Sequence, residues 1–109
     1  TGAVIERGSN ANGEYVRFAD GTQICVSQEF PVDVVTSQGS GFYSSPETWT
    51  YPAPFAAAPF VTAECTNNSS NTWGTAQPSS ATTSAALVLH AWVSVGSRTM
   101  QGMAYGRWF

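Results

Sequence analysis

His90 is the single histidine of this 109-residue chain, so acid–base chemistry near neutral pH has to use it. A serine nucleophile would need His90 with Asp20 or Asp33, but Asp20 belongs to an Asp-Gly turn and no G-x-S-x-G motif occurs. A glycosidase carboxylate pair finds little support, because five of the seven acids lie in the first thirty-three residues, beside turns or in expected strands. We therefore predict that the protein is not an enzyme; an esterase or glycosidase using Asp33 or His90 is the weakest alternative.

Aromatic side chains in polar surroundings offer a different chemistry, the binding of sugars. Trp and Tyr rings pack against sugar C–H groups, while neighbouring polar side chains bind hydroxyls, and a planar guanidinium suits carboxylated sugars. The residues that qualify are Tyr43, Trp73, His90, Trp92 and Arg98. We expect them to form a carbohydrate site; packing in the core or in an interface is the alternative for His90 and Trp92.

Short β-strands have to position these side chains, and the clearest hairpin spans residues 11–26. Asp20-Gly21 fits a two-residue type I′ turn, which predicts that Tyr15 pairs with Val26. Tyr15, Ile24 and Val26 then share one face, and the hairpin carries apolar groups on both faces. We expect one face in the core and the other against a partner surface.

Alternation and turn residues predict the other strands. Residues 85–95 alternate, Gly96-Ser97 fits a type II′ turn, and residues 99–109 return as a terminal strand, which makes a long final hairpin. Shorter strands are expected near residues 30–35, 48–51, 60–65 and 73–76, with Phe42 and Tyr43 in a loop. The fold class predicted is all-β, an antiparallel β-sandwich of about six or seven strands without helices.

Composition limits the partners. Only 10% of residues are charged, the net charge is −3, and four scattered arginines form no basic stripe, which argues against nucleic acid. The apolar run at residues 53–63 is too short for a membrane span and contains prolines, so no membrane insertion is expected. Cys25 and Cys65 lack metal-ligand spacing; we interpret both as buried free thiols, with one disulfide as the alternative, and predict no metal or cofactor.

Three sequence segments resemble the C-terminal domains of bacteriophage tail fibres and spikes. The first contains Gly13, Arg17-Phe18, Asp20-Gly21 and Ile24; the second Tyr51-Pro52, Phe55, Pro59 and Val61; the third Ala104, Gly106 and Trp108. The second and third segments are also similar to the H-type lectins, six-stranded sandwiches that assemble as parallel trimers and bind sugars near the subunit boundary.

The resemblance implies an H-type-lectin-like homotrimer on the virion, assembled in the bacterial cytoplasm. Residues 1–12 would connect to an upstream fibre or shaft, because the start of the chain lacks a signal-peptide pattern and looks cut from a longer protein, and residues 13–109 would form the receptor-binding domain. Tyr15, Ile24 and Val26 would form the trimer interface. The expected partners are host cell-surface polysaccharide and other virion proteins; a structural trimerisation or assembly domain that binds no glycan is the alternative.

Overall fold

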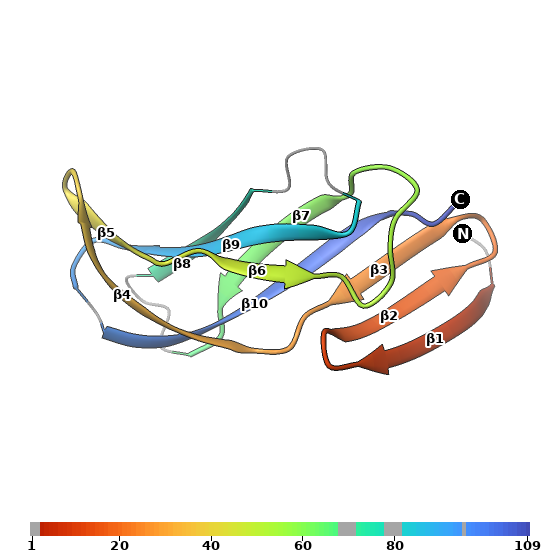
Figure 1. The fold of residues 1–109 in the computed structure, drawn as a ribbon, viewed down its shortest axis with the longest axis horizontal. Coiled ribbons are helices and arrows are strands. Elements are labelled where there is room, and N and C mark those ends of the chain that lie inside the picture. Colours follow the sequence, from red (N-terminus) through yellow and green to blue (C-terminus); the bar gives the residue numbers. More distant parts are fainter. Residues whose placement is uncertain (1–2, 68–71, 78–81, 95) are drawn as a thin grey trace.

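Ten antiparallel β-strands build the computed structural model, which describes residues 3–67, 72–77, 82–94 and 96–109 (Figure 1). The strands are β1 (Val4–Asn10), β2 (Gly13–Phe18), β3 (Thr22–Val26), β4 (Phe30–Gln38), β5 (Gly41–Ser44), β6 (Glu47–Thr50), β7 (Phe60–Cys65), β8 (Thr72–Gln77), β9 (Ser84–Ala91) and β10 (Gly96–Arg107). No helix occurs in these described ranges, which confirms the all-β prediction. The number of strands is ten, rather than the six or seven expected.

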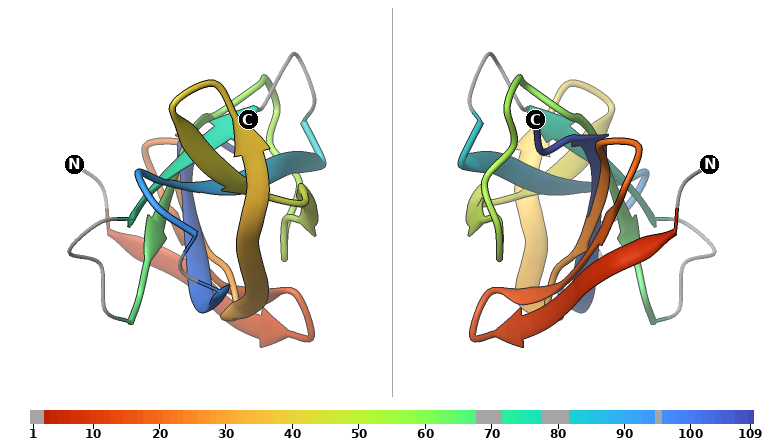
Figure 2. Two further views of the ribbon diagram at one scale, coloured as in Figure 1. Left: turned by 90° about the vertical axis from the view of Figure 1, so that its left-hand side faces the viewer. Right: turned by 90° about the vertical axis from the view of Figure 1, so that its right-hand side faces the viewer.

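Two long strands, β9 and β10, organise the assembly. β10 pairs with β4 and then β3 along one edge and with β7 along the other. β9 pairs with β8 on one edge and with β5 and β6 on the other. The β4–β5 hairpin joins these two groups of strands, while β1 and β2 extend the sheet from β3 and run obliquely across the other strands in the end views of Figure 2. The result is an elongated molecule of 45 × 24 × 23 Å.

Apolar side chains from β4, β6, β9 and β10 fill the interior. The large apolar side chains without solvent exposure are Val34, Trp49, Leu87, Leu89 and Met100. Tyr51 packs edge-to-face against Trp49 on one side and Phe55 on the other, with 5.1 Å between ring centroids in both pairs. A Cβ on Gly102 would come within 2.8 Å of Leu87 Cδ1, so glycine at this position lets β10 approach β9 closely.

The turn between β2 and β3 differs from the predicted type I′ turn. The amide of Gly21 donates to the carbonyl of Phe18 over 3.1 Å, and Gly21 has a φ of +99°. These are the features of a three-residue loop that ends in a glycine bulge. The aspartate keeps its turn role, because Asp20 Oδ1 accepts from the Thr22 amide at 2.9 Å.

The longer loop shifts the strand register by one residue, so the predicted pairs are wrong. Tyr15 pairs with Cys25 rather than Val26. Since facing residues share a side of the sheet, Tyr15 lies on the face opposite to Ile24 and Val26. The predicted grouping of these three residues on one face is therefore wrong, and only Ile24 and Val26 remain together.

The predicted final hairpin is also wrong. Over the described residues, β9 and β10 pair with other strands and not with each other. Both strands bury an apolar face, and the Leu87 side chain approaches the backbone of Gly102 across the interior. Alternation predicts which face of a strand is buried, but it does not tell edge-to-edge pairing from face-to-face packing.

Two polar segments form strands that the sequence analysis did not predict. Residues 4–10, expected to be a connection, form β1 and pair with β2. Residues 41–44, expected to be an exposed loop, form β5 after a Gly39-Ser40 turn in which Gly39 has a φ of +56°. Neither segment shows clear apolar alternation, because β1 is mostly exposed and β5 is short.

Both cysteines are free thiols. Cys25 is buried as predicted, and burial raises its pKa to about 11, whereas Cys65 is only partly buried. Among the described residues, no helix is long and apolar enough to cross a membrane.

Candidate carbohydrate-binding site

Three predicted site residues form one row across neighbouring strands. Trp73 on β8 pairs with His90 on β9, and His90 pairs with Tyr43 on β5. Facing residues point to the same side of a sheet, so the pairing brings these side chains together from segments far apart in the sequence. Trp92 lies just past the end of β9, and its ring centroid is 5.1 Å from that of Trp73.

The rings of Trp73, His90 and Trp92 form a bent aromatic surface. The planes of Trp73 and His90 differ by only 17°, with centroids 5.9 Å apart, while Trp92 is tilted by 50° from Trp73. Trp73 is 39% exposed and Trp92 63%. Aromatic faces open to solvent at this density are typical of a surface that binds a ligand.

A groove of about 220 Å³ lies against these rings. It is lined by Ser40, Gly41, Phe42, Trp73, His90, Ala91 and Trp92. Drug-sized ligands occupy pockets of about 300–1,000 Å³, so this volume suits one small ring rather than a large ligand. We call this the aromatic groove.

A hydrogen bond fixes the His90 ring. The Thr75 hydroxyl lies 3.0 Å from His90 Nε2, and either atom can be the donor, depending on the tautomer. Among the hydrogen bonds of the described residues, His90 uses only this nitrogen, which leaves Nδ1 for a ligand. This arrangement orients the imidazole for binding and does not pair it with a carboxylate, as a catalytic triad would require.

Two of the five predicted site residues do not line the groove. Tyr43 shares the row with His90 but is half-buried. Arg98 lies on β10 opposite Val32, and its Nη1 donates to the Ser97 carbonyl over 2.8 Å.

Four lining residues were not predicted as site residues. Gly41 and Phe42 come from β5, Ala91 from the end of β9, and Ser40 from the turn that precedes β5. The Gly-Ser-Gly sequence before the Phe42-Tyr43 pair is a signal for a tight turn that carries aromatic residues.

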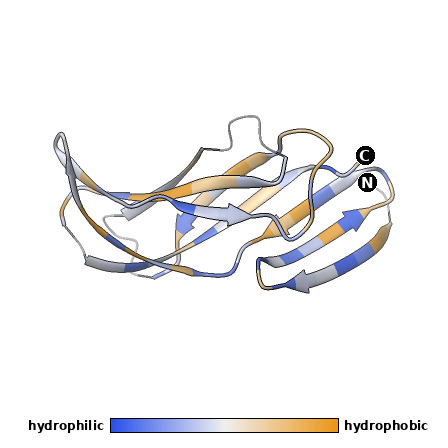
Figure 3. Cartoon of the chain, viewed as in Figure 1, coloured by the Kyte–Doolittle hydropathy of each residue, from blue (hydrophilic) through white to orange (hydrophobic). Residues whose placement is uncertain are grey.

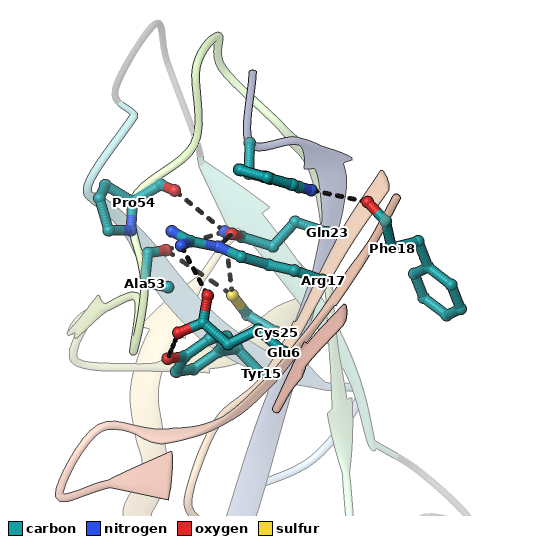
Figure 4. Close-up of polar contacts among 9 residues, drawn as sticks. Glu6, Tyr15, Arg17, Phe18, Gln23, Cys25, Ala53 and Pro54 are labelled. Carbon is teal, nitrogen blue, oxygen red and sulfur yellow. Dashed lines mark hydrogen bonds and ion pairs between the residues drawn. The ribbon is translucent and has the colours of Figure 1, made fainter. Parts of the chain in front are cut away.

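The opposite end of the molecule holds a polar network (Figure 4). The buried Gln23 Nε2 donates to the carbonyls of Ala53 and Pro54, at 3.0 Å each, and Gln23 Oε1 accepts from Arg17 Nε at 2.7 Å. These hydrogen bonds connect the β2–β3 hairpin to the segment that contains Ala53 and Pro54. We call this set of hydrogen bonds the Gln23 network.

Glu6 and Tyr15 extend the Gln23 network toward solvent. The Tyr15 hydroxyl donates to Glu6 Oε2 at 2.6 Å, and Arg17 Nη1 lies 3.1 Å from Glu6 Oε1. The hydrogen bond from Tyr15, supported by Arg17, lowers the pKa of Glu6, and the same bond raises the pKa of Tyr15. Across the described residues, no group of three or more His, Cys, Asp or Glu side chains is placed to hold a metal.

The aromatic groove combines flat apolar ring faces with a few polar groups beside them. No protein-family model, curated protein or solved structure matches the chain.

Proposed function

We propose that the chain is a non-enzymatic host-surface recognition domain of a phage or phage-like tail fibre or spike that binds cell-surface polysaccharide. The observation that carries this proposal is the gathering of Trp73, His90 and Trp92 around one groove. Trp faces stack on sugar C–H groups, and the imidazole of His90, which lines the groove, can hydrogen-bond a hydroxyl.

The position of the tail-fibre-like segments supports the phage context. The second segment contributes Phe55 and Pro59, and the third contributes Gly106. A Cβ on Gly106 would lie 3.0 Å from the Phe55 ring and 3.1 Å from Pro59 Cβ, so the two segments pack directly on each other. Residues far apart in the sequence thus belong to one packed unit, which explains why the segments would occur together.

Homotrimeric assembly in an H-type-lectin-like arrangement is part of the proposal. Ile24 lies in a row with Tyr105 and Phe60, and Val26 lies beside Met103 on the same face. Phe60 is 70% exposed and Tyr105 52%. An exposed apolar face of this kind is typical of an interface between protein chains. Three weak sugar sites would then bind a repetitive polymer with enhanced avidity.

The same apolar face favours a second candidate function, a trimerisation or assembly domain that binds no glycan. The exposed face around Phe60 and Tyr105 explains assembly alone. Trp73 on β8 and Trp92 after β9 lie outside this face and need a separate explanation.

Glycan binding tests the first function. A chain whose trimeric state has been verified is applied to an array of host capsule and lipopolysaccharide fractions, and Trp92→Ala is applied in parallel. We expect binding to at least one fraction and its loss in Trp92→Ala. Absence of binding by the wild-type trimer, together with normal attachment of particles that lack the domain, would contradict the proposal.

Assembly is tested separately with Phe60→Asp. Because Phe60 is largely exposed, the substitution should leave the subunit folded while introducing a charge into the interface. Sedimentation should change from trimer to monomer. If the wild-type chain is monomeric at all concentrations, the trimer proposal is wrong. If deletion of the domain blocks fibre assembly and no glycan binds, the second function replaces the first.

A further inference from the structure

We infer that the aromatic groove selects neutral pyranoses and excludes uronic acids and other anionic sugars. This inference rests on the proposed carbohydrate function, and it names the class of sugar. The sequence analysis left acidic sugars open through Arg98; the structure gives a reason to exclude them.

Among the described residues that line the groove there is no acid and no arginine. Its seven lining residues are Ser40, Gly41, Phe42, Trp73, His90, Ala91 and Trp92, none of them an acid or an arginine. All eleven acidic and arginine side chains of the sequence lie in the part of the chain that the structure describes, so none is overlooked in the ranges outside it. A carboxylate in the groove would find no guanidinium there.

The arginines lie elsewhere. Arg98 donates to its own neighbour, Ser97, on β10. Arg17 is bound to Gln23 and Glu6 in the Gln23 network. Arg107 donates to the Asp20 carbonyl at 2.7 Å, and Arg7 lies on β1. Those three belong to the end of the molecule that holds β1–β3.

Physical chemistry then separates the two classes of sugar. A carboxylate that moves from water into the groove loses part of its hydration. Because no arginine lines the groove, no ion pair offsets this cost. The net charge of −3 adds a weak long-range repulsion for anions, which salt reduces. A neutral pyranose loses only the hydration of a few hydroxyls, which hydrogen bonds can replace.

The groove also offers what a neutral pyranose needs. Gly41 has no side chain, so a ring can approach the aromatic side chains closely at this position. Because Trp92 is tilted by 50° from Trp73, one flat sugar face can stack on only one of the two indoles, and the other indole contacts the ring edge. Ser40 and His90 also line the groove, and their side chains can exchange hydrogen bonds with sugar hydroxyls.

Matched sugar pairs test this inference. The folded chain is titrated with the methyl glycosides of glucose, galactose, mannose and N-acetylglucosamine, and with the uronic acids of the first three, following Trp fluorescence and indole N–H shifts. We expect at least one neutral glycoside to bind, its uronic acid to bind about tenfold more weakly or less, and the neutral affinity to change by less than about twofold between low and high salt. A uronic acid that binds as tightly as its neutral partner, with affinity that falls as salt rises, would overturn the inference and leave the proposed function intact. If no glycoside binds, the inference fails, and binding of the host polysaccharide fractions decides separately whether the proposed function fails as well.

Two substitutions sharpen the result. Ser40→Arg places a cation at the rim, and we expect the uronic acid to gain about fivefold or more in affinity while the neutral glycoside changes little. Failure of Ser40→Arg to improve uronic acid binding would show that a missing cation is not the cause of exclusion. Phe109→Ala is the matched control for Trp92→Ala, because Phe109 is 62% exposed but lies at the C-terminus; the control should bind neutral glycosides as the wild type does.

Discussion

The two ends of this molecule use polar and aromatic residues in opposite ways. At the end formed by β1–β3, the hydrophilic bands on β1 and β2 in Figure 3 include side chains that bond to one another, and Gln23 is buried among carbonyls. At the other end, Trp73 and Trp92 expose their rings beside a groove with no acid or arginine among its described lining residues. From this difference we assign a structural role to the mutually hydrogen-bonded polar groups and propose a binding role for the exposed rings beside the groove.

The largest predicted effect is a loss of stability when the Gln23 network, at the end formed by β1–β3, is disrupted. Gln23→Ala removes the donor to the buried carbonyl of Ala53 and to the part-buried carbonyl of Pro54, and we expect a loss of about 2–4 kcal/mol in the free energy of unfolding. Urea denaturation measures it. Gln28→Ala, at an exposed position, is the control and should change stability by less than about 0.5 kcal/mol. The folded Gln23→Ala protein should keep the wild-type sugar affinity; reduced affinity would show that the two ends are not independent.

Alkaline pH should lower the stability of the protein through Cys25, which lies on β3 at the same end as the Gln23 network. Burial raises the pKa of Cys25 from 9.0 to about 11, so the folded state holds the thiol proton more tightly than the unfolded state. The associated stability is fully present below pH 9 and is lost as pH rises toward 11, to a total of about 2–3 kcal/mol. Urea midpoints measured across this range should fall more steeply for the wild type than for Cys25→Ala. Equal slopes would contradict the assignment.

At the binding end, the expected effect falls on affinity rather than on stability. Trp73→Ala should weaken the binding of a neutral glycoside about tenfold or more, or ~1.4 kcal/mol, because stacking area is lost. Since Trp73 is 39% exposed and lies outside the core cluster, unfolding should change by less than about 1 kcal/mol. A large loss of stability with unchanged affinity would reverse the roles that we assign to the two ends.

The smallest effect concerns the exposed ion pair. The pKa of Glu6 lies below its usual value of 4.5 because of the Tyr15 hydroxyl and then Arg17. Its contribution is present above pH 4.5 and is lost as pH falls through the lowered value. Glu6→Gln should therefore flatten the acid side of the stability profile slightly, and added salt should reduce the difference, since the pair is exposed. An unchanged acid slope in Glu6→Gln would contradict this.

The sequence predicted local features better than long-range pairing. The alternation in residues 85–95 identified the buried face of β9, and Trp73, His90 and Trp92 were selected by residue type and surroundings. The pairing of Trp73 with His90 depends on a register set by other strands, so no local pattern shows it. The one-residue shift around Gly21 shows the same limit, because one extra loop residue moved Tyr15 to the other face. Ser40 and Gly41 line the aromatic groove because of the β4–β5 hairpin, and the strands of this hairpin lack the clear apolar alternation that would have predicted it.

The most direct test of the carbohydrate site maps its position. Backbone and indole N–H shifts are followed while the chain is titrated with a neutral glycoside or host polysaccharide that binds. The proposal predicts saturable shifts at the Trp73 and Trp92 indoles and at Phe42 and Ala91, with none at Gln23. Shifts confined to the end that holds Gln23, or binding that leaves both indoles unchanged, would contradict it.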